Sequence, residues 1–150
     1  MISNIAIAVL SLAAVTSASK LQINNHCTEL LWLTIAKPSD PYPKPFSLAS
    51  GEAYDAGTNS GEGNSVGVTF SKDFYSEGTP KFILGYSIAG DRLWWSVGKS
   101  NGDVFDGKHF NVTTPDRDGK NVCESVSSYE QKNNNCVDGS FTLTFNPCFE

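Results

Sequence analysis

The sequence predicts an all-β protein, a sandwich of about seven or eight short antiparallel strands held together by disulfides. Apolar residues alternate with polar ones at a period of two in most apolar stretches, as they do in half-buried strands. Turns rich in glycine, asparagine and proline separate these stretches, and four cysteines follow an apolar leader. No segment shows the apolar stripe of an amphipathic helix, which repeats about every 3.6 residues.

Each predicted strand is marked by its apolar positions. These are Leu21 and Ile23; residues 30–36; Val66, Val68 and Phe70; residues 82–88; Leu93, Trp95 and Val97; Phe110 and Val112; and Phe141, Leu143 and Phe145. Segments 30–36 and 82–88 are more uniformly apolar than the others, which predicts strands covered on both faces.

Residues that favour turns divide the strands. Residues 89–91 (Ala-Gly-Asp) separate two of them, and residues 101–102 (Asn-Gly) suit the positive φ angles of a type I′ hairpin turn. Residues 38–45 contain four prolines, and we expect an extended loop between strands, with a polyproline II ligand as the alternative. Residues 55–65 are rich in glycine, asparagine and serine, which predicts a mobile loop.

The N-terminal segment has the pattern of an export signal. Residues 5–15 are an apolar run, and the small residues 16–19 that follow suit signal peptidase. The run is shorter than the ~20 residues needed to cross a bilayer, so we expect no membrane anchor. Residues 1–19 are therefore predicted to be a signal peptide, and residues 20–150 to be one secreted domain, extracellular or associated with the cell wall.

The chain is acidic. Its formal net charge is −5, and all charged residues follow the leader. This balance argues against nucleic-acid binding, because a protein that contacts phosphates needs a basic surface. We expect a monomer without a nucleic-acid partner.

Four cysteines lie beyond the leader: Cys27, Cys123, Cys136 and Cys148. They lack the close C-x-x-C pairs of a structural zinc site, and an even number of cysteines in an exported chain indicates disulfides. Four cysteines allow three pairings, and the spacing alone selects none of them. Asn111 begins an N-glycosylation sequon that agrees with export, although so short a motif also arises by chance.

The motifs that resemble catalytic or metal sites have simpler structural explanations. Residues 63–67 match the G-x-S-x-G pattern of a hydrolase nucleophile elbow, but a strand pattern follows where the elbow requires a helix. His26 and His109 belong to no metal-binding or catalytic array, and residues 101–106 hold only a fragment of a calcium loop that turn chemistry explains. We therefore predict no catalytic residue, no metal site and no cofactor.

Acidic residues and two tryptophans are candidates for ligand binding. Six carboxylates could serve a glycosidase by number, but no spacing selects a pair: Glu29, Glu52, Asp55, Asp91, Asp103 and Asp106. Adjacent strand residues point to opposite faces, so burying Trp95 turns Trp94 outward, where its indole can stack on a sugar. We favour the alternative that both faces of this strand are covered. Trp94, Glu52, Asp91 and Asp103 are the candidate ligand-binding residues, and the three carboxylates either line one groove with Trp94 at its rim or lie scattered over unrelated turns.

Several segments together resemble a known family. They are residues 23–27 (INNHC), 31–32 (LW), 48–54 (LASGEAY), 86–95 (YSIAGDRLWW) and 102–107 (GDVFDG). In this order and spacing they resemble the Blastomyces yeast-phase-specific protein domain, a fungal secreted family that is itself similar to a reduced thaumatin-like protein. The resemblance spans most of residues 20–150.

The resemblance implies a thaumatin-like β-sandwich in which the first and last cysteines pair, giving Cys27–Cys148 and Cys123–Cys136. It also implies an extracellular or wall-associated protein without catalysis. We therefore expect a secreted, noncatalytic fungal protein acting at the cell wall or host interface, with a wall polysaccharide or a host protein as partner. The alternatives are a small β-glucan-binding or β-glucan-hydrolysing protein, and an inhibitor of proteases or other hydrolases presented on the proline-rich loop.

Overall fold

The computed structural model describes residues 19–116, 118–129, 132–137 and 141–149. Within these ranges the chain forms ten β-strands and no helix. The described part accordingly contains no helix long and apolar enough to cross a bilayer. The predicted signal peptide, residues 1–19, lies outside the described residues except for Ser19.

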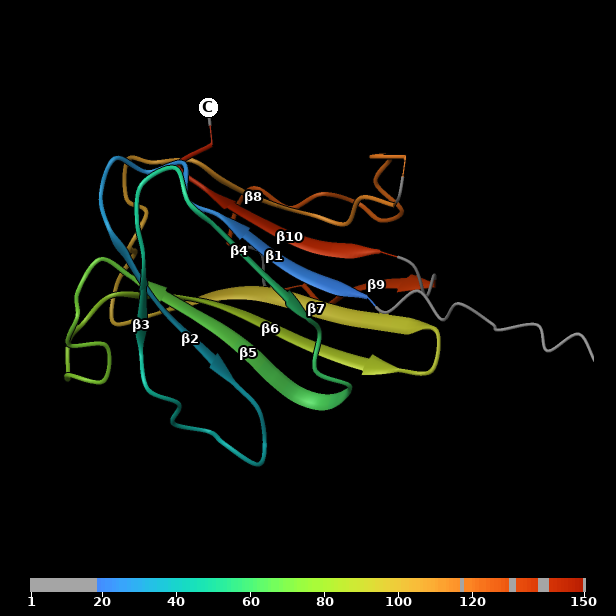
Figure 1. Cartoon of the computed structure of the whole chain (residues 1–150), viewed down its shortest axis with the longest axis horizontal. Coiled ribbons are helices and arrows are strands. Elements are labelled where there is room, and N and C mark those ends of the chain that lie inside the picture. The colour runs from blue at the N-terminus through green and yellow to red at the C-terminus, as the bar shows by residue number, and fades with distance from the viewer. Residues whose placement is uncertain (1–18, 117, 130–131, 138–140, 150) are drawn as a thin grey trace, which may run out of the picture.

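The strands form two sheets that lie against each other (Figure 1). The smaller sheet has the order β4 (Ala53–Gly57), β1 (Lys20–Asn24), β10 (Thr142–Pro147) and β8 (Phe110–Thr113). The larger sheet has the order β3 (Phe46–Leu48), β2 (Leu31–Ala36), β5 (Gly61–Thr69), β6 (Lys81–Ala89), β7 (Arg92–Ser100) and β9 (Asn134–Val137). The predicted all-β, disulfide-linked sandwich is confirmed, with ten strands in place of seven or eight.

The three strands that the sequence did not reveal are β3, β4 and β9. Each lies at the edge of its sheet, and none is longer than five residues. Edge strands have a neighbour on one side only and are often short and polar, which protects them from pairing with other chains. β4 and β9 accordingly lack a clear apolar alternation, and β3, which alternates Phe46, Ser47 and Leu48, is too short for its alternation to mark a strand.

The prediction of a mobile loop over residues 55–65 is wrong. β4 ends at Gly57 and β5 begins at Gly61, so only residues 58–60 connect them. Main-chain pairing with β1 and β6 keeps these turn-favouring residues extended, because the partner strands supply the hydrogen bonds. The register shifts between Gly61 and Asn64, where Gly61 and Gly63 take φ angles of 89° and 75° and form a β-bulge.

The first and last strands are parallel neighbours, whereas every other pairing between the described strands is antiparallel. Because β1 and β10 run in the same direction, the residues that follow them emerge at the same edge of the sheet. Cys27 and Cys148 meet there and form a disulfide, with their Cα atoms 4.9 Å apart. Cys123 pairs with Cys136, so the structure has the connectivity that the family resemblance implies.

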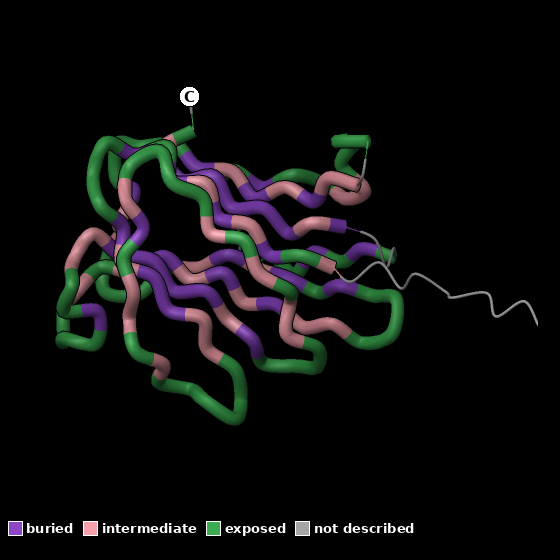
Figure 2. The backbone as a smooth tube through the Cα atoms, in the orientation of Figure 1, coloured by how far each residue is buried: buried purple, intermediate pink, exposed green. Residues whose placement is uncertain are grey.

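The core lies between the sheets, where the buried stretches of their strands face each other (Figure 2). At its centre Phe82 of β6 stacks on Phe145 of β10, with ring centroids 4.3 Å apart. Phe105, Phe110 and Tyr129 surround Phe82 at centroid distances of 5.7, 5.1 and 6.0 Å. This aromatic cluster joins the two sheets.

The prediction that segments 30–36 and 82–88 are covered on both faces is wrong. β2 and β6 bury alternate residues such as Leu33 and Leu84, and most of the residues between these are only half-buried. One face of the six-stranded sheet therefore packs on the core, and the other face is partly open to solvent.

Of the two predicted hairpin turns, the first forms a hairpin and the second does not. A hairpin joins β6 to β7 at the predicted place, with Gly90 and Asp91 between the strands, Ala89 as the last residue of β6, and a φ of 62° at Gly90. Asn101 and Gly102 have the expected positive φ angles of 57° and 112°. They do not form a hairpin, because β7 pairs with β6 and β9, and β8 belongs to the other sheet. The proline-rich residues 38–45 connect β2 to β3, as predicted, but the connection begins with a turn in which Lys37 and Asp40 exchange main-chain hydrogen bonds, and so it is not extended throughout.

Candidate functional site

Trp94 lies on the solvent-facing side of β7 and is 42% exposed. Its neighbour Trp95 is 2% exposed and belongs to the core. The side chains opposite Trp94 on the adjacent strands, Ser87 and Asn135, are too small to cover an indole. The alternative that we favoured, in which both faces of this strand are covered, is therefore wrong.

A hollow of about 460 Å³ lies beside Trp94. Its lining residues are Glu62, Gly63, Asn64, Gly85, Tyr86, Ser87, Trp94, Trp95, Ser96 and Asn133. They come from the adjacent strands β5, β6 and β7 and from the residue before β9. The sheet surface is recessed here because Gly85 has no side chain and its partner Ser96 has a short one.

The bulge in β5 forms one side of the hollow. It brings Gly63 next to Ser87, and the Gly63 amide donates a hydrogen bond to Ser87 Oγ at 3.2 Å. The bulge gives β5 one residue more than the opposite stretch of β6, and Glu62 within it is among the lining residues. Bulges often re-aim side chains near functional sites, which agrees with the position of this one.

The lining combines one aromatic ring with uncharged polar groups. Trp94 offers the face of its indole, and Ser96 and Asn133 offer a hydroxyl and an amide. Within the described ranges, Glu62 is the only charged lining residue, and no histidine, cysteine, lysine or arginine is among the residues that line the hollow. Such a surface suits a neutral ligand with one apolar face and several hydroxyl groups.

The acidic residues predicted to accompany Trp94 lie elsewhere, and none of them lines the hollow. Asp91 is in the turn between β6 and β7, whereas Asp103 follows the opposite end of β7. Glu52 precedes β4 of the other sheet, and its Oε2 accepts a hydrogen bond from the Ala49 amide at 2.8 Å. The structure does not bring these three carboxylates together with Trp94, and their role in ligand binding stays a prediction.

Asp103 instead anchors the chain after β7. Its Oδ1 accepts hydrogen bonds from the Tyr129 hydroxyl at 2.8 Å and the Phe105 amide at 2.9 Å, and Lys99 Nζ lies 3.3 Å from Oδ2. Burial alone would raise the pKa of Asp103, but these three donors outweigh it and hold the pKa below its usual value. Burial and the bond to Asp103 together raise the pKa of Tyr129. Asp103 is thus explained by local structure.

We expect Tyr129→Phe to lower the free energy of unfolding by about 1.5–3 kcal/mol, the usual contribution of a hydrogen bond to a charged group. The ring keeps its contacts with Phe82 and Phe110, so the change isolates the hydroxyl. The pKa of Asp103 is lower in the folded than in the unfolded state, so the ionised carboxylate stabilises the fold at pH values above the unfolded-state pKa. This stabilisation is lost as the pH falls through the folded-state pKa. Urea denaturation measures this effect. We expect the free energies of unfolding of the wild type and Tyr129→Phe to differ at neutral pH, and this difference to narrow below about pH 4. Equal stability at neutral pH would contradict the prediction.

The sequence analysis did not identify Glu62 or Asn133 as candidates. Predicting a loop over residues 55–65 leaves Glu62 without a defined face of a strand. Extending the alternation of Val66 and Val68 backwards through the buried Asn64 would have placed Glu62 on the core face, because the register shift between Gly61 and Asn64 is not visible in the sequence. Asn133 has no comparable signal, because it reaches the hollow only through the pairing of β7 with β9.

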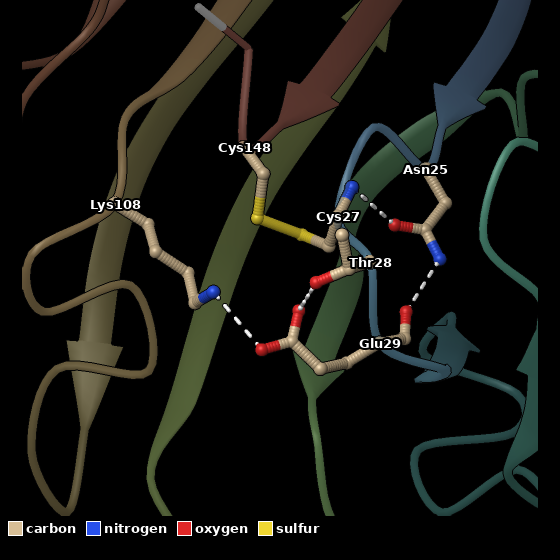
Figure 3. A network of polar contacts seen from close by, with 6 residues as sticks. All are labelled: Asn25, Cys27, Thr28, Glu29, Lys108 and Cys148. Carbon is tan, nitrogen blue, oxygen red and sulfur yellow. Dashed lines mark hydrogen bonds and ion pairs between the residues drawn. A yellow bond between two sulfur atoms is a disulfide. The ribbon is translucent and has the colours of Figure 1, made fainter.

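Asn25 organises the segment that carries Cys27 (Figure 3). Its buried side chain accepts a hydrogen bond from the Cys27 amide at 2.9 Å and donates one to the Glu29 carbonyl at 3.0 Å. Lys108 Nζ forms an ion pair with Glu29 Oε1 at 3.0 Å, and the Thr28 hydroxyl donates to Glu29 Oε2 at 2.9 Å. These bonds from Lys108 and Thr28 hold the pKa of Glu29 below its usual value. The segment is therefore fixed mainly by local polar contacts.

The remaining motifs gain no catalytic arrangement. His26 and His109 line a second hollow, of about 270 Å³, beside the Cys27–Cys148 disulfide. No group of three metal-binding side chains gathers anywhere in the described ranges. Ser65 of the G-x-S-x-G match lies within β5, paired with neighbours on both sides, and not at a strand-to-helix turn.

The sequon residue Asn111 is part of an amide ladder on the four-stranded sheet. Asn24 Nδ2 donates to Asn146 Oδ1 at 2.7 Å, and Asn146 Nδ2 donates to Asn111 Oδ1 at 2.7 Å. The ladder crosses the adjacent strands β1, β10 and β8. Among the described contacts it uses only the oxygen of the Asn111 amide, whereas a glycan attaches to the nitrogen. Glycosylation at Asn111 is therefore compatible with the ladder.

We expect the protein secreted from a fungal host to carry an N-glycan at Asn111 that Thr113→Val removes. Thr113→Val leaves the amide ladder intact, whereas Asn111→Ala removes both the glycan and a ladder bond, costing about 1 kcal/mol more in the free energy of unfolding. Gel mobility before and after N-glycosidase treatment, followed by urea denaturation of the deglycosylated proteins, measures both effects. A glycan on the Thr113→Val variant would contradict the prediction.

Comparisons with known proteins give a family and confirm the fold. A family model described as Blastomyces yeast-phase-specific protein matches residues 7–148. The structure is similar to the protein elicitor MoHrip2 from Magnaporthe oryzae, with a TM-score of 0.69 and 15% identity, covering 88% of this chain and 100% of that one. It is also similar to the thaumatin-like xylanase inhibitor TLXI, with a TM-score of 0.65 and 12% identity, covering 86% of this chain and 99% of that one. No curated protein matches the sequence. The predicted thaumatin-like sandwich is confirmed.

Proposed function

We propose, from the premise that this chain belongs to the Blastomyces yeast-phase-specific protein family, that it is a secreted, noncatalytic protein that binds a cell-wall polysaccharide. In this role it acts at the fungal cell wall or at the interface with a host. The observation that carries the proposal is the exposed Trp94 beside a hollow whose lining is polar and almost uncharged.

The cysteines support an extracellular location. All four cysteines form disulfides. Such bonds persist in oxidising compartments and are rare in the cytosol. One of the similar structures is described as a protein elicitor, which supports a role at the host interface.

The chemistry of the hollow supports a sugar as ligand. A pyranose ring has an apolar face of C–H groups, which stacks on an indole, and a rim of hydroxyl groups, which bond to amides, hydroxyls and carboxylates. Trp94 supplies the indole, and Asn133, Ser96 and Glu62 supply the polar partners. The net charge of −5 makes a polyanionic ligand unfavourable.

The lining of the hollow also supports binding without hydrolysis. Cleavage of a glycosidic bond generally requires two carboxyl groups roughly 5–10 Å apart. Of the described residues that line the hollow, only Glu62 has a carboxyl group. Among the residues that the structure describes, a ligand held there would meet one carboxylate without the second.

Retention on insoluble polysaccharides tests the proposal. We expect the wild-type domain to be retained on at least one of chitin, β-1,3-glucan, cellulose and xylan, and Trp94→Ala to bind at least about tenfold more weakly, as for a central aromatic anchor. Tyr42→Ala is the matched control, because Tyr42 is an even more exposed aromatic residue (79%) and does not line the hollow. Absence of retention on all four, or full retention of Trp94→Ala, would overturn the proposal. Release of reducing sugar that Glu62→Gln abolishes would indicate a hydrolase instead.

A second candidate function is inhibition of a secreted hydrolase, favoured by the proline-rich loop. Tyr42 and Tyr75 are both exposed at this loop, in edge contact at a centroid distance of 6.0 Å. The Tyr75 hydroxyl donates a hydrogen bond to the Pro43 carbonyl at 2.6 Å, which holds the loop in place. Exposed tyrosines on a restrained loop are typical of protein-binding surfaces. A panel of xylanases, glucanases and proteases tests this, and inhibition that Tyr42→Ala removes would support it.

A further inference from the structure

A row of small residues crosses the outer face of the six-stranded sheet. Ala36 of β2 pairs with Ser65 of β5, Ser65 with Gly85 of β6, and Gly85 with Ser96 of β7. Directly paired residues lie on the same face, so these four stand side by side across four strands. All four are half-buried, and none is longer than serine. Gly85 and Ser96 at one end of the row belong to the hollow beside Trp94.

Larger side chains stand on both sides of this row. On one side is Trp94, two residues before Ser96 on the same strand. On the other side are Ile83 and the ring of Phe74, which covers Gly67 so closely that an added Cβ there would overlap it. We call the strip of sheet surface over these four residues the trough and the four residues its floor; the Gly85–Ser96 end belongs to the hollow.

The floor is long enough for several sugar rings. Neighbouring strands lie about 4.8 Å apart, so four strands extend the floor to about 14 Å. The four floor residues are one alanine, two serines and one glycine, so none of them is charged or long. A branch on the ligand would meet Trp94 on one side or Ile83 on the other. These features suit an extended, unbranched and uncharged chain.

We infer that the ligand is an uncharged, unbranched polysaccharide that lies across the strands in this trough, with Trp94 stacked against a ring at the β7 end. The inference rests on the proposed function, to which it adds the class and direction of the polysaccharide. It assigns a binding role to Ser65 and Ala36, which lie outside the hollow. The acidic charge of the protein supports an uncharged ligand, because it would repel a polyanion such as polygalacturonate.

Two leucine variants test whether the polysaccharide lies across the strands. Ser65→Leu fills the floor two strands away from β7, whereas Gly98→Leu enlarges a side chain on β7 itself, two residues beyond Ser96. An added Cβ at Gly98 meets nothing within 4 Å, so the first atom of the new side chain is free of overlap. We expect Ser65→Leu to weaken retention at least about tenfold and Gly98→Leu to change it less than about twofold. Ala36→Leu, at the far end of the floor, replaces Ser65→Leu if thermal unfolding shows that the latter is destabilised.

The outcomes separate this inference from the proposed function. If the wild type binds and Trp94→Ala does not, but Ser65→Leu binds normally, the ligand does not cross the strands and only the inference fails. Equal weakening by Ser65→Leu and Gly98→Leu also overturns the inference. Failure of the wild type to bind any wall polysaccharide overturns both. Hexasaccharides of chitin, β-1,3-glucan and cellulose identify the source of the chain, and retention on polygalacturonate would contradict an uncharged ligand.

Discussion

The double variant Cys27→Ser, Cys148→Ser is expected to lose about 5 kcal/mol of its free energy of unfolding, as the chain-entropy model gives for so long a loop. The disulfide joins residues separated by 121 positions, so its removal frees nearly the whole domain in the unfolded state. It also links the ends of the parallel strands β1 and β10. The value is an upper one, because residual structure in the unfolded chain reduces the entropy that is gained.

The second disulfide provides the matched control. Cys123 and Cys136 are 13 positions apart, so the variant Cys123→Ser, Cys136→Ser is expected to lose about 3 kcal/mol. Guanidinium denaturation of the two variants and the wild type under the same conditions measures the difference. A loss from the short bridge that equals or exceeds the loss from the long one would contradict the prediction.

Phe82→Ala is expected to lower the free energy of unfolding by about 3–5 kcal/mol, as for other large residues removed from a tightly packed core. Phe82 is fully buried and contacts rings from both the opposite sheet and the loops that flank it. Its removal leaves a cavity beside Phe145 of the other sheet. Among the described rings, only that of Phe82 stacks in parallel on Phe145. The loss therefore includes both the buried area and the contact between the sheets.

Ile83→Ala controls for the loss of an apolar side chain from the same strand. Ile83 points to the opposite face of β6 and is only half-buried, so we expect its loss to cost less than half as much as that of Phe82. Urea denaturation followed by tryptophan fluorescence measures both variants. A cost for Ile83→Ala similar to that for Phe82→Ala would show that the outer face is packed as tightly as the core.

The central strands could be predicted because burial of one face imposes an alternation that the chain itself displays. Leu21 and Ile23, or Leu93 and Trp95, are apolar at every second position for this reason. The edge strands β4 and β9 could not be predicted in the same way. Main-chain pairing with a single neighbour keeps them extended, and this pairing leaves little mark on their side chains.

Only part of the candidate site could be predicted from the sequence. The opposite orientations of Trp94 and Trp95 follow from their being adjacent in a strand. Whether a second layer covers Trp94 depends on the small side chains of Ser87 and Asn135, which belong to other strands. The carboxylates grouped with Trp94 on the basis of type alone are spread over turns of both sheets, whereas Glu62 reaches the hollow through a bulge.

By itself the sequence determined the fold class, the central strands and the presence of four cysteines suited to disulfides, because each of these leaves a local pattern of residue types. The tertiary structure decided which strands are neighbours. Strand order brings β1 beside β10 and so joins Cys27 to Cys148, and it aligns Ala36, Ser65, Gly85 and Ser96 in one row. Such neighbours are set by the packing of two sheets around a common core, which depends on residues far apart in the chain and not on any single segment.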